Sequence, residues 1–185
     1  MLLLAALLLA AEPAAAEREV LDSFKAACAR PGNIEEMKAD AVAAGWEPIA
    51  DEAEPRVARL NELGRKSVEK DAKTAGANYR RSFGERVVFL ILSRYEDKTG
   101  VWGAGCRLYD FEATVPLDSA MLEGWMGKPP TGVQNPLPGL SKHLWEPGWR
   151  DGITLEVNHV PQGHEVGKMF GLSGNILVAQ ALGGF

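Results

Sequence analysis

The sequence predicts an α+β fold of two layers, with N-terminal helices packed on one face of an antiparallel sheet of four to five strands. Apolar residues recur at helical spacing in the first third of the chain. Strand-like alternation follows from about residue 86 onward, where β-branched and aromatic residues gather. Helices that come before strands, rather than alternating with them, fit a two-layer α+β domain.

The chain opens with an apolar stretch that is typical of an export signal. Residues 2–10 are all Leu or Ala, and Ala14-Ala15-Ala16 precedes the first charge cluster. An apolar run that ends in an A-x-A site predicts a secretory signal peptide. We therefore divide the chain into a signal peptide, residues 1–16, and a single α+β domain, residues 17–185. The run is about half the roughly 20 residues that a membrane helix needs, so no membrane span is predicted.

Two helices are predicted at the start of the domain. The first covers residues 20–29, and its apolar side chains share one face: Val20, Leu21, Phe24, Ala27 and Cys28. The second begins after Asn33, a good N-cap residue with Glu36 three positions later, and ends at Gly45. A third helix, charged and superficial, is predicted from Asp51 to about Lys70, followed by a polar linker to Arg81.

Four strands, a short helix and a long loop are predicted in the remainder. The strands are Val87–Tyr95, Val101–Phe111, Ile153–Val160 and Asn175–Leu182, and they form two hairpins. The first is apolar on both faces, which predicts a central position. A short helix is predicted over Pro116–Met126, and the segment Lys128–Gly148 is expected to be an extended loop because it is rich in Pro and Gly.

The two cysteines, Cys28 and Cys106, are predicted to form a disulfide. Each lies on a predicted core face, one on a helix and one on a strand. An exported chain with an even number of cysteines favours pairing, since disulfides persist in oxidising compartments. We therefore expect an exported, periplasmic, disulfide-linked protein.

Composition limits the class of partner. The chain has 20 basic and 25 acidic residues, and no run of basic residues exceeds two. Cleavage after Ala16 leaves 169 residues with a net charge near −4. This balance argues against a nucleic-acid partner, which would select basic patches.

Two hypotheses about function stay open at this point. The first is a non-catalytic module in which Trp145 and Trp149 contact a small apolar or carbohydrate ligand, or another envelope protein. The alternative is a small hydrolase that uses His159 or His164 as a base, although no nucleophile is placed beside either. We favour the non-catalytic module. No cofactor is predicted, and no metal site, because His159 and His164 are separated by a strand end and a loop.

The order of elements also carries a resemblance. An exported N-terminus is followed by a helix with Phe24 and Cys28, then by Gly45-Trp46, then by a hairpin that ends in Cys106. In this order the chain resembles small exported proteobacterial proteins of unknown function. The resemblance implies a compartment and a class of protein, and it implies no active site.

Overall fold

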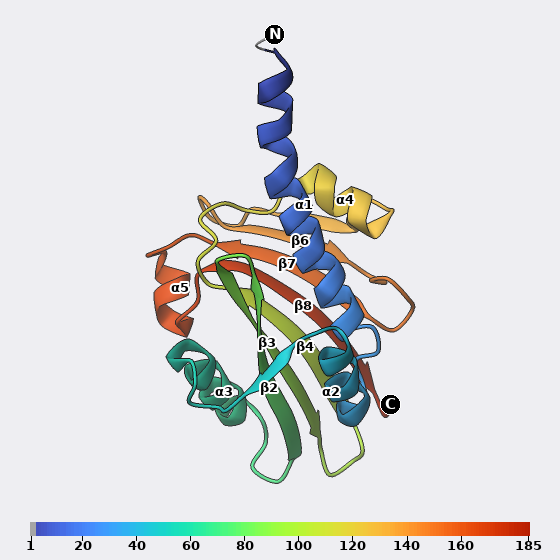
Figure 1. The fold of residues 1–185 in the computed structure, drawn as a ribbon. Coiled ribbons are helices and arrows are strands. Elements are labelled where there is room, and N and C mark those ends of the chain that lie inside the picture. Colours follow the sequence, from blue (N-terminus) through green and yellow to red (C-terminus); the bar gives the residue numbers. More distant parts are fainter. Residues whose placement is uncertain (1–2) are drawn as a thin grey trace.

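Five helices and eight strands make up the residues that the computed structural model describes, 3–185, with side chains described from Ala15 onward (Figure 1). The helices are α1 (Leu3–Ala27), α2 (Ile34–Ala43), α3 (Pro55–Ser67), α4 (Ser119–Met126) and α5 (Glu165–Phe170). The strands are β1 (Glu47–Ile49), β2 (Lys73–Phe83), β3 (Arg86–Glu96), β4 (Trp102–Asp110), β5 (Gly132–Gln134), β6 (Ser141–Trp145), β7 (Thr154–Val160) and β8 (Gly174–Gly183).

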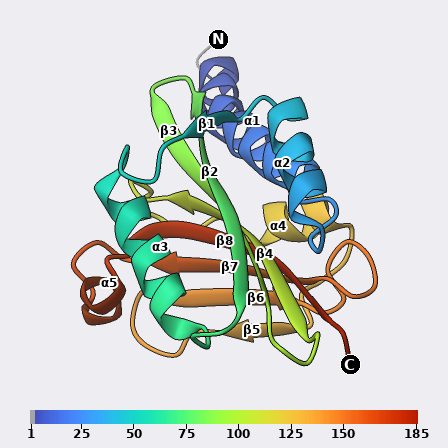
Figure 2. The same ribbon diagram turned by 90° about the horizontal axis from the view of Figure 1, so that it is seen from below.

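All eight strands belong to one antiparallel sheet of order β1-β2-β3-β4-β8-β7-β6-β5. Strands β1–β4 form one meander and β5–β8 form a second, and the pairing of β4 with β8 joins them. The sheet is strongly twisted, so that β2 and β3 run across the direction of β6 and β7 (Figure 2). Such twist follows from the right-handed preference of each strand.

Strand β3 lies inside the sheet, between β2 and β4, and is buried on both faces. Leu90 and Leu92 point to one face, into a core cluster shared with α1, α2 and α4. Phe89 and Ile91 point to the opposite face, into a smaller cluster that includes Val57 of α3. Because successive side chains of a strand point to opposite faces of the sheet, the apolar residues of β3 contribute to both core clusters.

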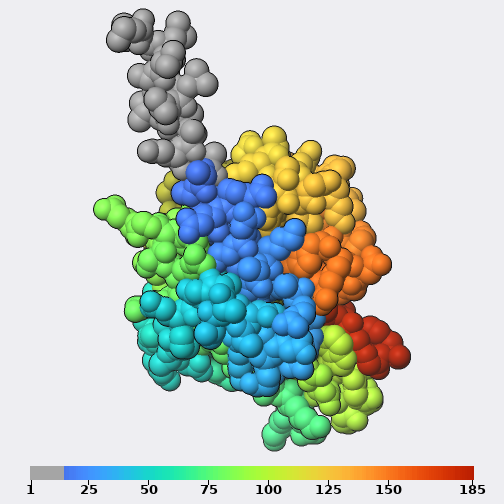
Figure 3. Space-filling model, turned by 45° about the vertical axis from the view of Figure 1, so that its right-hand side comes forward, coloured from blue at the N-terminus to red at the C-terminus, as the bar shows by residue number. Residues whose placement is uncertain are grey.

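Helices α1, α2 and α4 cover the first of these faces. Phe24 of α1, Met37 of α2 and Leu122 of α4 are fully buried in the same cluster. Asn33 caps α2 as its sequence predicts, because its side-chain oxygen accepts hydrogen bonds from the backbone N–H groups of Glu35 and Glu36. The space-filling view shows α1 between α2 and α4 on this side of the molecule (Figure 3).

The predicted sheet of four to five strands is wrong, because eight strands are present. The predicted polar linker to Arg81 contains most of β2, which pairs with β3 over its whole length. The predicted loop Lys128–Gly148 contains β5 and β6, and β1 follows α2. These strands are short or polar, and pairing with a neighbouring strand stabilises them more than their own composition does.

The predicted two-layer arrangement also needs correction. Helix α3 lies on the face of the sheet opposite α1 and α2, where Val57 packs into the second cluster. Figure 2 shows α3 crossing this face and α5 lying beside α3. Helix α3 is shorter than predicted, and α5 was not predicted, since six residues are too few for a clear helical pattern.

The predicted disulfide is confirmed. Cys28, just after α1, is bonded to Cys106 of β4, with a Cα–Cα distance of 5.6 Å. Both residues are fully buried. The bridge therefore fixes the C-terminal end of α1 to the middle of the sheet.

The predicted signal peptide, residues 1–16, lies mostly outside the described side chains. The backbone of α1 is helical from Leu3 and extends past the body of the protein, as Figure 1 shows. Among the residues that the structure describes, no helix combines the length and the apolar character that crossing a bilayer requires.

A charge at the start of α3 provides a test of how this helix is held. Glu54 accepts hydrogen bonds from the backbone N–H of Arg56 at 3.2 Å and from its Nε at 2.8 Å. The guanidinium bond holds the pKa of Glu54 below its ordinary value. A lowered pKa gives stability that is present above about pH 4.3 and is lost as pH falls through the folded-state pKa.

We expect Glu54→Gln to lower the free energy of unfolding by about 0.5–1 kcal/mol at pH 7, and by much less at pH 3. Glutamine keeps an acceptor oxygen, so the comparison isolates the charge. Urea denaturation at both pH values measures the difference. Glu52→Gln, an exposed neighbour, is the control and should change little. An equal loss of unfolding free energy in Glu54→Gln and Glu52→Gln would show that the charge of Glu54 has no special role at the start of α3.

Candidate ligand groove

A groove of about 790 Å³ lies between α3, the connection that follows it, and strands β2 to β4. We call it the α3 groove. One wall is made by the second half of α3, including Leu60, Asn61 and Arg65. Its floor is the face of the sheet that α3 crosses (Figure 2). The volume falls in the range of sites for small organic ligands, roughly 300–1,000 Å³.

The groove is hollow partly because its floor is poor in side chains. In neighbouring strands Gly76 pairs with Ser93, and Ser93 pairs with Gly105. An added Cβ at Gly105 would lie 2.4 Å from Nη1 of Arg107, so this glycine allows the guanidinium to lie flat on the sheet. Gly103 does the same for the ring of Tyr95, again at 2.4 Å. Larger residues at these positions would lift both side chains and fill the groove.

Arg107 is the chemically distinctive residue of the floor. It is half-buried, and its Nη1 donates a hydrogen bond to Ser93 Oγ at 2.7 Å. No carboxylate among the described residues forms an ion pair with it, whereas Arg56, Arg81 and Arg86 all have one. A guanidinium with free donors in a partly desolvated position can hold an anionic group strongly.

The positive charge of Arg107 also affects Tyr109, a buried residue that lines the groove beside it. Burial raises the pKa of Tyr109, and the charge of Arg107 partly opposes that rise. Tyr109 lies two residues from Arg107 on the same strand face and is only 6% exposed. It therefore stays a neutral phenol at physiological pH, and leaves the charge of Arg107 uncompensated.

A polar network connects the α3 wall of the groove to the sheet. Asn61 of α3 donates to Asn78 Oδ1 at 3.1 Å, and Asn78 donates to Asp51 at 2.7 Å. Arg65 pairs with Asp51 at 3.5 Å. Asn78 is buried, so its amide must be satisfied in this way. The network therefore ties α3 to β2.

The remaining lining is mixed. Leu60, Ile91, Val101 and the ring of Tyr95 give apolar surface, while no histidine or cysteine lies among the lining residues. The arrangement can therefore hold an apolar body beside a charged head group. It supplies no imidazole or thiol, and its carboxylates are those of Asp51, Glu69 and Asp97.

The tryptophans predicted to contact ligand lie elsewhere. Trp145 is fully buried in the first core cluster, and its Nε1 donates to the carbonyl of Lys128 at 3.1 Å. Trp149 packs edge-on against Phe24 and Trp125, with ring centroids 6.0 and 6.4 Å away. Neither residue lines the α3 groove, and Trp145 has no surface to offer a ligand.

The histidines of the hydrolase hypothesis are not brought together. His159 is 3% exposed, and its Nδ1 faces Asn175 Oδ1 at 2.9 Å. His164 caps α5, where its Nδ1 accepts a hydrogen bond from the backbone N–H of Val166. In the described part of the chain, neither imidazole contacts a serine hydroxyl, and no group of three metal-ligating side chains is found.

The structure does contain one serine–histidine contact, which the sequence analysis missed. Ser119 Oγ lies 3.0 Å from Nε2 of His143, which packs against Trp145. Ser119 is the first residue of α4, and His143 lies on β6. Within the described residues, His143 has no hydrogen-bonded carboxylate to orient it, so the contact lacks the third member of a catalytic triad.

Comparison with known proteins finds no matching family model, no matching curated protein and no matching solved structure.

Proposed function

We propose that this is an exported, non-catalytic binding protein that holds a small amphipathic anion in the α3 groove. The unpaired guanidinium of Arg107 on the groove floor carries the proposal. An anionic head group would take the donors that Ser93 leaves free, and an apolar body would lie against Leu60, Ile91 and Tyr95.

The geometry favours a small ligand over a protein partner. A concave groove between a helix and a sheet encloses a small molecule on several sides, whereas protein interfaces are broader. Carbohydrate ligands are disfavoured, because the buried Trp145 and packed Trp149 leave no flat indole exposed in the groove.

The compartment that we propose is the periplasm. The disulfide between Cys28 and Cys106 supports an oxidising compartment, and the apolar start of the chain supports export. The resemblance to small exported proteobacterial proteins points the same way. N-terminal sequencing of the protein from a producing bacterium tests this, and we expect it to begin at Glu17.

The binding proposal is tested with anilinonaphthalene sulfonate, a fluorescent probe that joins an apolar body to an anionic group. We expect saturable binding to the wild-type protein. Replacing Arg107 with glutamine removes a charge-assisted hydrogen bond of about 1.5–3 kcal/mol, so Kd should rise roughly 10-fold to 150-fold. Fluorescence titration measures both values.

The matched control is Arg80→Gln. Arg80 lies on β2, pairs with Glu47 at 3.2 Å, and does not line the groove. This substitution removes one positive charge but changes no side chain that lines the groove, so Kd should stay within about twofold of wild type. Equal weakening by both substitutions would mean that the probe responds to net charge, and would refute the role of Arg107.

A further inference from the structure

The charges that line the α3 groove narrow the class of ligand that it can hold. Three acidic and three basic residues are among the lining, so its formal charge is zero. They are Asp51, Glu69, Asp97, Arg65, Arg94 and Arg107. These charges are not evenly spread, because several of them already have partners. The ligand class therefore depends on which charges stay free and on where they lie.

Two of the three lining arginines are occupied. Arg65 pairs with Asp51 at 3.5 Å on the wall of the groove. Arg94 pairs with Glu96 at 2.9 Å, and its Nε donates to a backbone carbonyl in the connection between α1 and α2. The guanidinium of Arg94 is therefore directed to the face of the sheet opposite the groove. Within the described residues, Arg107 is the one lining arginine without an ion-pair partner.

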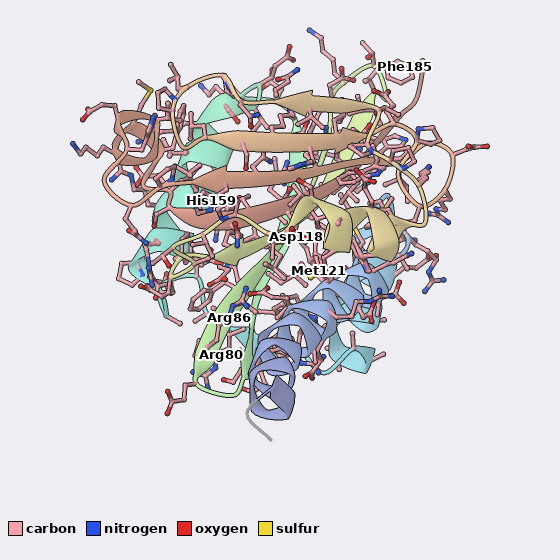
Figure 4. The ribbon with its side chains drawn as sticks, turned by 90° about the horizontal axis from the view of Figure 1, so that it is seen from above. Arg80, Arg86, Asp118, Met121, His159 and Phe185 are labelled. Atoms are coloured by element: carbon pink, nitrogen blue, oxygen red, sulfur yellow. A yellow bond between two sulfur atoms is a disulfide. The ribbon has the colours of Figure 1, made fainter. Side chains whose placement is uncertain are left out.

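The other arginines of the β2–β3 hairpin lie outside the α3 groove. Arg80 pairs with Glu47 at 3.2 Å, and Arg86 pairs with Glu17 at 2.8 Å. Figure 4 shows Arg80 and Arg86 toward the turn of this hairpin, beside α1. No lysine is among the residues that line the groove. The groove therefore offers a ligand one free cationic group.

The remaining acidic charges gather at one end of the groove. Asp97 directly follows β3, whose last residue, Glu96, pairs with Lys73 at the start of β2. Glu69 lies just before that point, since its carbonyl accepts a hydrogen bond at 3.1 Å from the backbone N–H of Ala72. Asp97 and Glu69 therefore flank the same end of the groove. A second anionic group on the ligand would be repelled there.

The other end of the groove is apolar. Ile91 belongs to the second core cluster, and Leu60 of α3 packs against it. Ile91 lies two residues before Ser93, the side chain to which Arg107 donates, on the side away from Asp97. Side chains two residues apart on a strand share a face and lie roughly 7 Å apart. A head group held at Arg107 can therefore extend an apolar tail over Ile91 and Leu60.

We infer that the ligand is a monocarboxylate with a long apolar tail, the chemistry of a fatty acid. Its carboxylate lies on Arg107 and its tail points toward Ile91. The inference rests on the proposed binding function and deepens it. One free guanidinium balances one negative charge, and its planar fork matches the two oxygens of a carboxylate. A phosphate monoester carries about −1.5 to −2 charges at pH 7, and the groove has no second free cation for it.

Competition with anilinonaphthalene sulfonate tests the head group in the wild-type protein at pH 8. The competitors are decanoate, decanol and decyl phosphate, which share a similar chain. We expect decanoate to displace the probe with a Kd roughly 10-fold below that of decanol, because decanol lacks the charge that Arg107 binds. Decyl phosphate should also bind roughly 10-fold more weakly than decanoate, since its second charge would be desolvated without a partner.

Repeating the competition at pH 5.5 separates the charge of the head group from its shape. The second pKa of a phosphate monoester is about 6, so decyl phosphate becomes mostly a monoanion at the lower pH. Its Kd should then come within about threefold of that of decanoate. The titratable groups of the lining are three arginines, three carboxylates and two tyrosines. No histidine, the side chain that ordinarily titrates in this range, is among them, so the change is assigned to the ligand.

Chain length tests the position of the tail. Burial against Leu60 and Ile91 should lower the Kd by up to about fourfold for each methylene group added from hexanoate to decanoate. A Kd that does not change along this series would contradict an apolar tail in the groove.

Two substitutions test the contact with Arg107. Calorimetric titration of Arg107→Gln should find nearly equal Kd values for decanoate and decanol, because the charge that distinguishes them has no partner left. Arg80→Gln, the matched control outside the groove, should keep the roughly 10-fold preference for decanoate. The comparisons in the wild-type protein stand on their own if Arg107→Gln fails to fold.

The outcomes separate this inference from the proposed function. If the probe binds through Arg107 but decanol or decyl phosphate competes as well as decanoate at pH 8, the inference is overturned and the proposed function stands. If the protein binds neither the probe nor decanoate, both are overturned. A preference for decanoate that is lost in Arg107→Gln and kept in Arg80→Gln supports the inference.

Discussion

Cys106→Ser is expected to lower the free energy of unfolding by about 4–5 kcal/mol, because the disulfide closes a long loop. Its two cysteines are 78 positions apart. The chain-entropy model assigns roughly this energy to a loop of such length. The total stability of a domain of this size is typically about 5–15 kcal/mol, so the loss is a large part of it.

Thermal unfolding measures the effect directly. A loss of that size should lower Tm by about 8–20 °C for a domain of 150–250 residues. The double variant Cys28→Ser/Cys106→Ser should lie close to the single one, because both remove the same bridge. An unchanged Tm in either variant would show that the bridge contributes nothing to stability.

Trp145→Ala is expected to be the second severe substitution, with a loss of about 3–5 kcal/mol. The side chain is fully buried, and its Nε1 donates to the carbonyl of Lys128 at 3.1 Å. Removal leaves a cavity in the first core cluster and an unpaired carbonyl. Urea denaturation measures the loss.

Two comparisons make this prediction specific. Trp145→Phe keeps most of the ring and loses the hydrogen bond, so we expect a loss of only about 1–2 kcal/mol. Affinity for the probe should stay near the wild-type value in Trp145→Phe, since this residue lies outside the α3 groove. If a folded Trp145→Phe variant no longer bound the probe, Trp145 would be shown to contribute to the ligand site, contrary to this prediction.

The elements that could be predicted are those with strong apolar patterns of their own. Strand β3 is apolar on both faces and is buried on both. Helix α2 carries its own N-cap in Asn33. The cysteines fell on predicted core faces, and the bridge between Cys28 and Cys106 brings those faces together.

The strands that were missed depend on their neighbours. Strand β2 contains Lys73, Arg80 and Arg81, so its polar composition hides eleven residues of pairing with β3. Strand β6 lies in a segment that Pro and Gly mark as a loop. Whether such a segment forms a strand depends on its pairing with a neighbouring strand, and the local sequence does not show that pairing.

The candidate site was missed for a related reason. Arg107 interrupts an apolar strand, and Gly103 and Gly105 precede it, but only the register of β2, β3 and β4 shows that they share one floor. Trp145, which one hypothesis placed in contact with a ligand, is fully buried in the core. A tryptophan near a Pro-rich segment has the same local sequence pattern whether it lies in the core or on an exposed surface.

The central claim, that Arg107 holds an anionic ligand in the α3 groove, is tested most directly by nuclear magnetic resonance. The side-chain Nε–Hε signal of Arg107 can be followed in a ¹H–¹⁵N spectrum while anilinonaphthalene sulfonate is added. The account predicts that this signal moves saturably, with the Kd found by fluorescence, while the signal of Arg80 stays in place. A stationary Arg107 signal at probe concentrations that saturate the fluorescence would contradict it.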